Sequence, residues 1–189
     1  MEFKEDIKNA LRILHEGGLI LYPTDTIWGI GCDATNEKAV QRIYQIKNRE
    51  DSKSMLVLID DPGRLYQYVN QIPEIAWEII DAAESPVTII YPDVKNLAAS
   101  LIADDHSAGI RIVKDKFCQQ LIQQLKKPIV STSANFSGEM PPGLFREISS
   151  KIKNSVDYTV KYRQDESIFR KPSGIIKLGV NGEVKVIRE

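Results

Sequence analysis

The sequence contains few of the residues that most enzymes use as nucleophiles, acid–base groups or metal ligands. Its 189 residues include two cysteines and two histidines. Cys32 and Cys118 lie far apart in the chain, which excludes a disulfide framework and a cysteine-rich zinc site, so we expect two buried free thiols. His15 and His106 lack the spacing of metal ligands and support no Ser-His-Asp triad. We therefore predict no metal site built by the protein alone and no histidine-activated nucleophile.

Two common nucleotide-binding signatures are also absent. The chain has no P-loop of the GKS or GKT type. The stretch GIGCD (29–33) has neither the spacing nor the position of a dinucleotide fingerprint. Any nucleotide site must therefore be built from other groups.

The sequence carries almost no net charge and has no long hydrophobic run. It has 25 basic and 26 acidic residues, a formal net charge of -1, so charge gives no case for nucleic-acid binding, although a local basic groove stays possible. No apolar segment reaches membrane-spanning length. The amphipathic N-terminal stretch 1–18 contains acidic residues, unlike a secretory signal. We expect a cytoplasmic protein with one domain over residues 1–189.

Apolar periodicity predicts strands and helices that alternate along most of the chain. Expected helices cover 3–17, 35–49, 115–125 and 144–152, and 62–84 is expected to be helical in one or two pieces. Expected strands cover 19–22, 55–59, 87–91, 109–113, 128–135, 168–178 and 183–188. This alternation indicates a mixed, largely three-layer α/β fold. The polar stretch IADDHSAG (102–109) is the best candidate for a mobile loop.

The stretch LYPTDTIWGIGCDAT (21–35) interrupts a buried strand with polar residues. Pro23 cannot donate to a central ladder, and it is followed by two threonines, Asp25 and Trp28. One interpretation is a turn, and the other is a binding site. The sequence leaves the role of Asp25 open, and Trp28 fits either a cavity wall or the core.

A cluster of cations follows the second expected helix, in KNREDSKS (47–54). Lys47, Arg49 and Lys53 can be a solvated helix end, where cations favour the macrodipole. They can also bind a polyphosphate, because lysine supplies a point charge and arginine a planar fork. The sequence alone does not choose between these two interpretations.

Polar side chains also end or interrupt three expected strands. Ser133 and Asn135 are alternate residues in STSAN (131–135), so both can point the same way, and strand ends of open α/β sheets are where ligands bind. Ser173 begins a late strand. Arg111 lies inside the apolar strand GIRIV and needs an anion, either a structural ion-pair partner or a ligand. Hydroxyls, an amide and cations suit charge stabilisation in a phosphoryl or nucleotidyl transfer.

These pieces together resemble the YrdC/TsaC family, the threonylcarbamoyl-AMP synthases. The resemblance extends over essentially the whole chain and is carried by GGLILYPTDTIWGIGCDA, AVQRIYQIKNRE, STSANFSG and KPSGIIKL. It implies an α/β fold with a twisted mixed sheet and flanking helices around a concave, basic cavity. It also implies that L-threonine, bicarbonate and ATP become threonylcarbamoyl-AMP and pyrophosphate, with Mg²⁺ accompanying ATP.

The resemblance also assigns residues by position. Lys47 and Arg49 match the catalytic Lys-x-Arg. The residues matched to ATP contacts are Lys47, Arg49, Lys53, Ser107, Asn135 and Arg188. The residues matched to L-threonine contacts are Thr26, Arg111, Ser133 and Ser173. The chain departs from the family pattern at Leu58, where some relatives have histidine, and at Gly174, where threonine is usual.

The product of such an enzyme is used by partner proteins that modify adenosine 37 (t6A37) of tRNAs reading ANN codons. An alternative of another class is a non-catalytic module that binds double-stranded RNA or tRNA with the same cavity. The hydroxyl-rich candidates favour a small-ligand pocket over a phosphate-tracking surface. A related enzyme acting on a sugar phosphate would need an acidic metal site, which the sequence does not offer.

Overall fold

A nine-stranded mixed sheet organises the residues that the computed structural model describes, 3–47 and 55–189. The strand order is β7-β1-β2-β6-β3-β5-β4-β8-β9. The strands are β1 (Ile20–Tyr22), β2 (Gly29–Gly31), β3 (Leu56–Ile59), β4 (Val87–Tyr91), β5 (Ala108–Ile112), β6 (Ile129–Ser133), β7 (Tyr158–Thr159), β8 (Gly174–Leu178) and β9 (Val184–Arg188). Parallel pairs (β1–β7, β3–β5, β4–β8) mix with antiparallel ones, which confirms the predicted mixed sheet.

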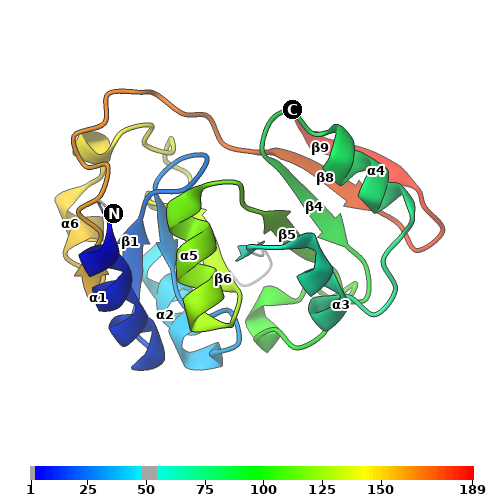
Figure 1. Ribbon diagram of the computed structural model, residues 1–189, viewed down its shortest axis with the longest axis horizontal. Coiled ribbons are helices and arrows are strands. Elements are labelled where there is room, and N and C mark those ends of the chain that lie inside the picture. The colour runs from blue at the N-terminus through cyan, green and yellow to red at the C-terminus, as the bar shows by residue number, and fades with distance from the viewer. Residues whose placement is uncertain (1–2, 48–54) are drawn as a thin grey trace.

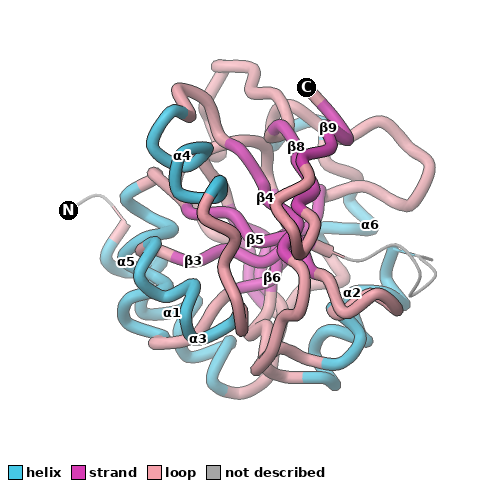
Figure 2. The backbone as a smooth tube through the Cα atoms, turned by 90° about the vertical axis from the view of Figure 1, so that its right-hand side faces the viewer, coloured by secondary structure: helices cyan, strands magenta, loops and turns pink. Residues whose placement is uncertain are grey.

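Helices flank this sheet on both faces (Figures 1 and 2). They are α1 (Lys4–His15), α2 (Glu37–Lys47), α3 (Leu65–Tyr68), α4 (Ile75–Ala82), α5 (Lys116–Leu125) and α6 (Ser150–Lys153), with 3-10 turns η1 (Pro62–Arg64), η2 (Ala99–Leu101) and η3 (Phe145–Glu147). Figure 2 shows α1 and α5 on one side of the strands and α2 on the other. None of these helices is long and apolar enough to span a bilayer.

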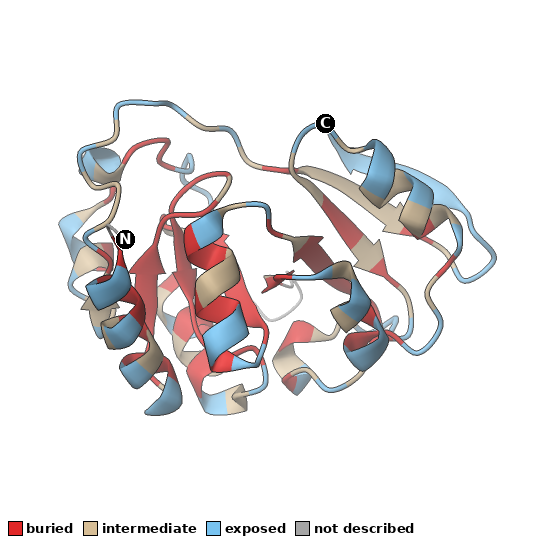
Figure 3. Cartoon of the chain, viewed as in Figure 1, coloured by how far each residue is buried: buried red, intermediate tan, exposed pale blue. Residues whose placement is uncertain are grey.

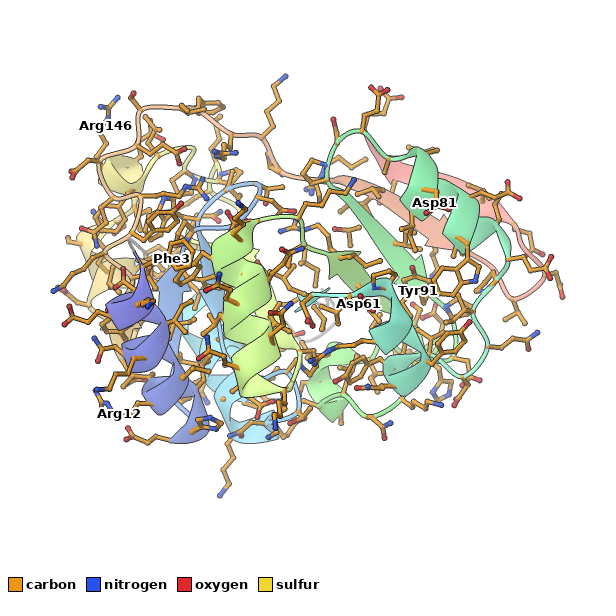
Figure 4. All side chains as sticks on the ribbon, in the orientation of Figure 1. Phe3, Arg12, Asp61, Asp81, Tyr91 and Arg146 are labelled. Atoms are coloured by element: carbon orange, nitrogen blue, oxygen red, sulfur yellow. The ribbon has the colours of Figure 1, made fainter. Side chains whose placement is uncertain are left out.

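Two apolar clusters hold the layers together. One cluster joins α1 and α5 to the face of the sheet that is turned toward the viewer in Figure 1, here called the near face. Phe3, labelled in Figure 4, belongs to this cluster and makes an edge-on contact with Phe117, with ring centroids 5.6 Å apart. The other cluster packs α2 and its neighbours against the far face. Figure 3 shows the result, since the strands β1, β2 and β6 between these layers are buried. The central strands are therefore covered on both faces, as their continuous apolar sequences predict.

Local signals place the helix ends close to where the sequence predicts them. The Asp115 side chain accepts a hydrogen bond from the Cys118 N–H at 3.0 Å and caps α5. Gly17, with φ of 77°, follows α1, and this left-handed conformation suits glycine. The predicted bounds of α1 and α5 are thus confirmed to within a few residues.

The segment 62–84, expected to be helical in one or two pieces, consists of η1 and α3 over 62–68 followed by α4, because residues 69–74 leave the helical path and Pro73 interrupts it. Three other expectations differ from the structure. The helix expected over 144–152 is η3 followed by α6. Only 174–178 of the strand expected over 168–178 is a strand. Gly29–Gly31, taken as part of a break, forms β2 and pairs antiparallel with β1.

Candidate active site

A cavity of about 970 Å³ lies on the part of the near sheet face that α1 and α5 leave uncovered. Alternate residues of a strand share a face. Under the two helices these residues are large and apolar, as at Leu58, Val113 and Ile129. Further along the same face, Gly109 lies four positions before Val113 and Ser131 two positions after Ile129, and both line the cavity. The cavity therefore exists because side chains on this face become small where the helical cover ends.

Six of the ten residues predicted for the site line this cavity: Thr26, Ser107, Arg111, Ser133, Ser173 and Arg188. They come from β5, β6, β9 and three connecting segments, so the fold brings together groups that are spread over most of the sequence. Lys47 and Asn135 lie next to the cavity without lining it. Arg49 and Lys53 lie outside the described residues.

Lys47 is buried at the end of α2 and fixes the Ser-x-Asn segment. Its Nζ donates hydrogen bonds to the carbonyl oxygens of Ser133 at 2.5 Å and Asn135 at 2.7 Å. Asn135 Nδ2 in turn donates to the carbonyls of Phe136 and Glu139 at 3.0 and 2.7 Å. Asn135 Oδ1 is buried without a hydrogen-bond partner in the described part of the chain. Lys47 thus orders the backbone that presents Ser133 to the cavity.

The loop that interrupts the first strand is held by its own hydroxyls. Thr24 Oγ1 accepts a hydrogen bond from the Thr26 N–H at 3.0 Å and donates to the Ile27 carbonyl at 2.8 Å. The loop is therefore both a turn and a cavity wall, since Thr26 lines the cavity. Trp28 borders the cavity but is 4% exposed and packs on Phe145 with ring centroids 4.7 Å apart, so it belongs mainly to the core.

The charge inside the apolar strand β5 has an ionic partner. Arg111 Nη2 lies 3.0 Å from Asp25 Oδ1, and the two side chains are 2% and 10% exposed. Neither group forms a well-aligned hydrogen bond there, so the contact is mainly ionic. Arg111 therefore has a structural ion-pair partner and also lines the cavity, and its contact with a ligand stays a prediction.

Ser173 and Arg188 both line the cavity and contact each other. The Ser173 hydroxyl shares a hydrogen bond of 2.8 Å with Thr88, and the Ser173 carbonyl accepts from Arg188 Nε and Nη2 at 3.0 and 2.8 Å. Burial and the nearby charge of Arg111 lower the pKa of Arg188. Two guanidinium groups that share one cavity favour an anionic ligand between them.

Several lining residues were missed by the sequence analysis. Thr88 in β4 and Lys177 in β8 line the cavity on the same sheet face as Gly109 and Ser131. The sequence signal that could have identified such lining residues is a small or polar residue at every second position of an otherwise apolar strand. The charged residues of the described lining are Arg111, Lys177, Arg188, Asp104 and Asp105, three basic against two acidic. This part of the lining is thus only slightly basic.

The segment expected to be a mobile loop is tied to the cavity wall by Asp105. Asp105 accepts hydrogen bonds from Lys177 Nζ at 2.5 Å and from Ser107 Oγ at 2.6 Å. These two contacts lower the pKa of Asp105 to about 2. Because Asp105 precedes β5 and Lys177 lies in β8, the ion pair links two separate lining segments, and Asp105 orders Ser107.

We expect the Asp105 carboxyl to titrate near pH 2 in the folded protein. Since its pKa is lowered on folding, its contribution to stability is present above about pH 4 and is lost as pH falls through 2. NMR titration of the side-chain carboxyl measures this value directly. The variant Lys177→Met should return the pKa toward about 4, and a pKa unchanged by that substitution would contradict the assigned cause.

Comparison with known proteins agrees with this architecture. The sequence model of the Sua5/YciO/YrdC family, described as "Telomere recombination", matches residues 12–189. A curated protein of Pseudoalteromonas translucida (strain TAC 125), named threonylcarbamoyl-AMP synthase, is 32% identical over 189 residues, covering 97% of this chain and 98% of that protein.

Two solved structures share the fold at lower identity. YciO of E. coli superposes with a TM-score of 0.84 at 24% identity, covering 98% of this chain and 89% of YciO. Sua5 of P. abyssi in complex with L-threonine superposes with a TM-score of 0.81 at 23% identity, covering 92% of this chain. The chain spans about half of that Sua5 protein, 51%. On the family match and the curated relative, the chain belongs to the Sua5/YciO/YrdC family.

Proposed function

We propose that the chain is a threonylcarbamoyl-AMP synthase, which converts L-threonine, bicarbonate and ATP to threonylcarbamoyl-AMP and pyrophosphate. The observation that carries the proposal is the gathering of the Thr26, Ser133 and Ser173 hydroxyls and the Arg111 guanidinium around one cavity. Threonine offers a carboxylate, an amine and a hydroxyl, which such a set can bind. The curated relative of almost equal length, named for this activity, supports the same conclusion.

The proposed reaction needs no covalent nucleophile from the protein. The threonine amine combines with bicarbonate to form a carbamate and water. A carbamate oxygen then attacks the α-phosphorus of ATP, and the bond to the β-phosphate oxygen breaks so that pyrophosphate leaves. The protein positions the reactants, limits access of water to the carbamate and stabilises negative charge.

The proposed roles divide the site between the two substrates. Thr26, Ser133, Ser173 and Arg111 bind threonine, with Arg111 at its carboxylate. Residues proposed to bind ATP are Lys47, Arg49, Lys53, Ser107, Asn135 and Arg188. A volume of about 970 Å³ is near the upper end of the range for small-molecule sites, which suits two substrates bound together.

Mg²⁺ is proposed to arrive with ATP. The described residues contain no group of three or more histidine, cysteine, aspartate or glutamate side chains placed to hold a metal ion. The cavity lining does include the carboxylates of Asp104 and Asp105. Mg²⁺ is commonly held by substrate phosphates with one or two carboxylates, so these residues fit a nucleotide-borne ion. Its chemistry there would be to offset charge on the phosphates.

The product would pass to tRNA threonylcarbamoyl-transferase proteins that form t6A37, in the cytoplasm. The alternative, a module that binds duplex RNA or tRNA without catalysis, predicts salt-sensitive RNA binding and no threonine-dependent turnover. It is less favoured because the described lining holds three basic and two acidic residues rather than a basic track. Direct tRNA contact, downstream partners and cytoplasmic location stay predictions.

A pyrophosphate-release assay with each substrate omitted in turn tests the function. We expect full release only with threonine, bicarbonate and ATP together. Arg49→Ala should lower the rate at least about 100-fold while circular dichroism stays unchanged, because a charge-stabilising donor is lost. Release independent of threonine would refute the proposed function. A wild-type rate in Arg49→Ala would refute only the phosphate-binding role of Arg49.

A further inference from the structure

The Asp25–Arg111 pair lies at the border between the helix-covered part of the sheet and the cavity. Nε and Nη2 of Arg111 are buried without aligned hydrogen bonds, and Nη2 is the nitrogen that contacts Asp25. Nη1 is not among the buried, unpaired nitrogens, and Arg111 lines the cavity. Asp25 therefore occupies the buried side of the guanidinium and leaves Nη1 as the nitrogen available to a ligand.

Hydrogen bonds within the loop and from two other segments fix the position of Asp25. Thr24 closes the turn through its hydroxyl, as described above. Arg163 Nη1 donates to the Thr24 carbonyl at 2.9 Å, and Cys118 Sγ donates to the Pro23 carbonyl at 3.4 Å. The loop is thus anchored to α5 and to the segment after β7. A carboxylate on so restrained a backbone can orient its partner.

Arg111 depends on Asp25 for charge compensation. Asp25 is its sole ion-pair partner within residues 3–47 and 55–189. Ionisable groups that interact with the pair in the described part of the chain include Tyr22 and Cys118, whose pKa values burial raises, and Arg188, which repels Arg111. A buried guanidinium without its carboxylate is costly and would turn toward water or another anion. Loss of Asp25 would therefore change the orientation of the Arg111 guanidinium.

We propose that Asp25 is a positioning residue for threonine: it holds the Arg111 guanidinium so that Nη1 meets the α-carboxylate of the substrate. This inference rests on the proposed function, and it assigns a role to the carboxylate that the sequence left open. Asp25 acts through Arg111 and does not itself touch the reacting atoms. Its effect must therefore appear in threonine binding and not in ATP binding.

The test compares Asp25→Asn with a matched control, Asp60→Asn. Asp60 pairs with Arg64 at 2.9 Å, is similarly buried and has an oxygen without an aligned hydrogen bond, but it does not line the cavity. In the pyrophosphate assay, Asp25→Asn should raise KM for threonine about tenfold and leave KM for ATP within about twofold. Asp60→Asn should leave both KM values within about twofold.

Several outcomes would overturn the inference. An unchanged or lowered threonine KM in Asp25→Asn would show that Asp25 is structural or competes with the substrate. A similar rise in both KM values would show a general loss of structure, which urea unfolding of both variants would reveal. If wild-type protein releases no pyrophosphate with threonine, the proposed function itself fails, which is a separate result. Asp25→Ala carries the same expectation if Asp25→Asn does not fold.

A double variant tests whether Asp25 acts through Arg111. Arg111→Lys keeps the positive charge but removes the planar fork, so it should also raise the threonine KM. If the two residues act as a unit, adding Asp25→Asn to Arg111→Lys should raise this KM by no more than about twofold further. Additive effects of the two substitutions would mean that Asp25 reaches threonine by another route, and would overturn the proposal.

Discussion

Replacing Lys47 by methionine is expected to lower the rate of pyrophosphate release at least about 100-fold and the free energy of unfolding by about 2 kcal/mol. Methionine fills much of the space of the buried lysine stem but cannot donate hydrogen bonds. Without the ammonium the Asn135 carbonyl would lose its donor, while the Ser133 carbonyl would keep the hydrogen bond from the Asn135 N–H at 2.9 Å. A buried carbonyl left without a donor costs about 1–3 kcal/mol. The segment that presents Ser133 and Asn135 would then lose its fixed geometry.

Lys127→Met is the control for removing a lysine charge elsewhere. Lys127 Nζ contacts Asp33 at 2.6 Å, but its side chain is half exposed and does not border the cavity. The Asp33 side chain is 6% exposed but keeps hydrogen bonds from the Thr35 N–H and hydroxyl, so stability should fall by about 1 kcal/mol or more while activity stays within about twofold. A Lys47→Met protein that is less stable but fully active would contradict the catalytic assignment and leave Lys47 a structural role.

The contacts of Lys47 refine what the sequence predicted. The family resemblance pairs Lys47 with Arg49 in a Lys-x-Arg motif that binds the nucleotide phosphates. The structure gives its ammonium two carbonyl acceptors at the end of β6, 86 and 88 residues away in the chain. Its charge therefore also stabilises the Ser-x-Asn turn. A ligand at that turn would meet a backbone already held by a cation, because Lys47 connects the end of α2 to the backbone of the Ser-x-Asn segment.

The sequence predicted those parts of the site that depend on local pattern. Ser133 and Ser173 stand out because they flank apolar strands, and Arg111 because a charge interrupts one. These three residues do line the cavity. The helices α1 and α5 were predictable because periodicity and capping residues act within a few positions.

The remaining features depend on long-range packing. Asp25 and Arg111 are 86 residues apart, and nothing in either segment identifies the other as its partner. Thr88 and Lys177 occur within ordinary strand sequences. They can be assigned to the cavity only when it is known that α1 and α5 leave part of that sheet face uncovered. Strand order in a mixed sheet sets this arrangement, and strand order does not follow from local periodicity.

Gly31→Ala is expected to lower the free energy of unfolding by about 3 kcal/mol, the upper range for overpacking a core. A Cβ atom at Gly31 would lie 2.5 Å from the Val130 carbonyl oxygen and 2.6 Å from the Tyr22 ring. Neither obstacle can move alone, because the Tyr22 hydroxyl donates to that same carbonyl at 3.0 Å. Urea unfolding measures the loss. Gly174→Ala is the control, since its nearest contact would be the Arg188 carbonyl at an ordinary 3.6 Å.

The same obstruction predicts an interaction between two substitutions. Tyr22→Phe removes the hydroxyl that ties the ring to Val130, so the ring can shift away from a new Cβ atom at Gly31. Gly31→Ala should therefore cost about 1 kcal/mol less in the Tyr22→Phe protein than in the wild type. An equal cost in both backgrounds would mean that the Val130 carbonyl alone causes the strain. Because Val130 precedes Ser131, this close packing of β1 and β2 on β6 also fixes the strand that forms the cavity floor.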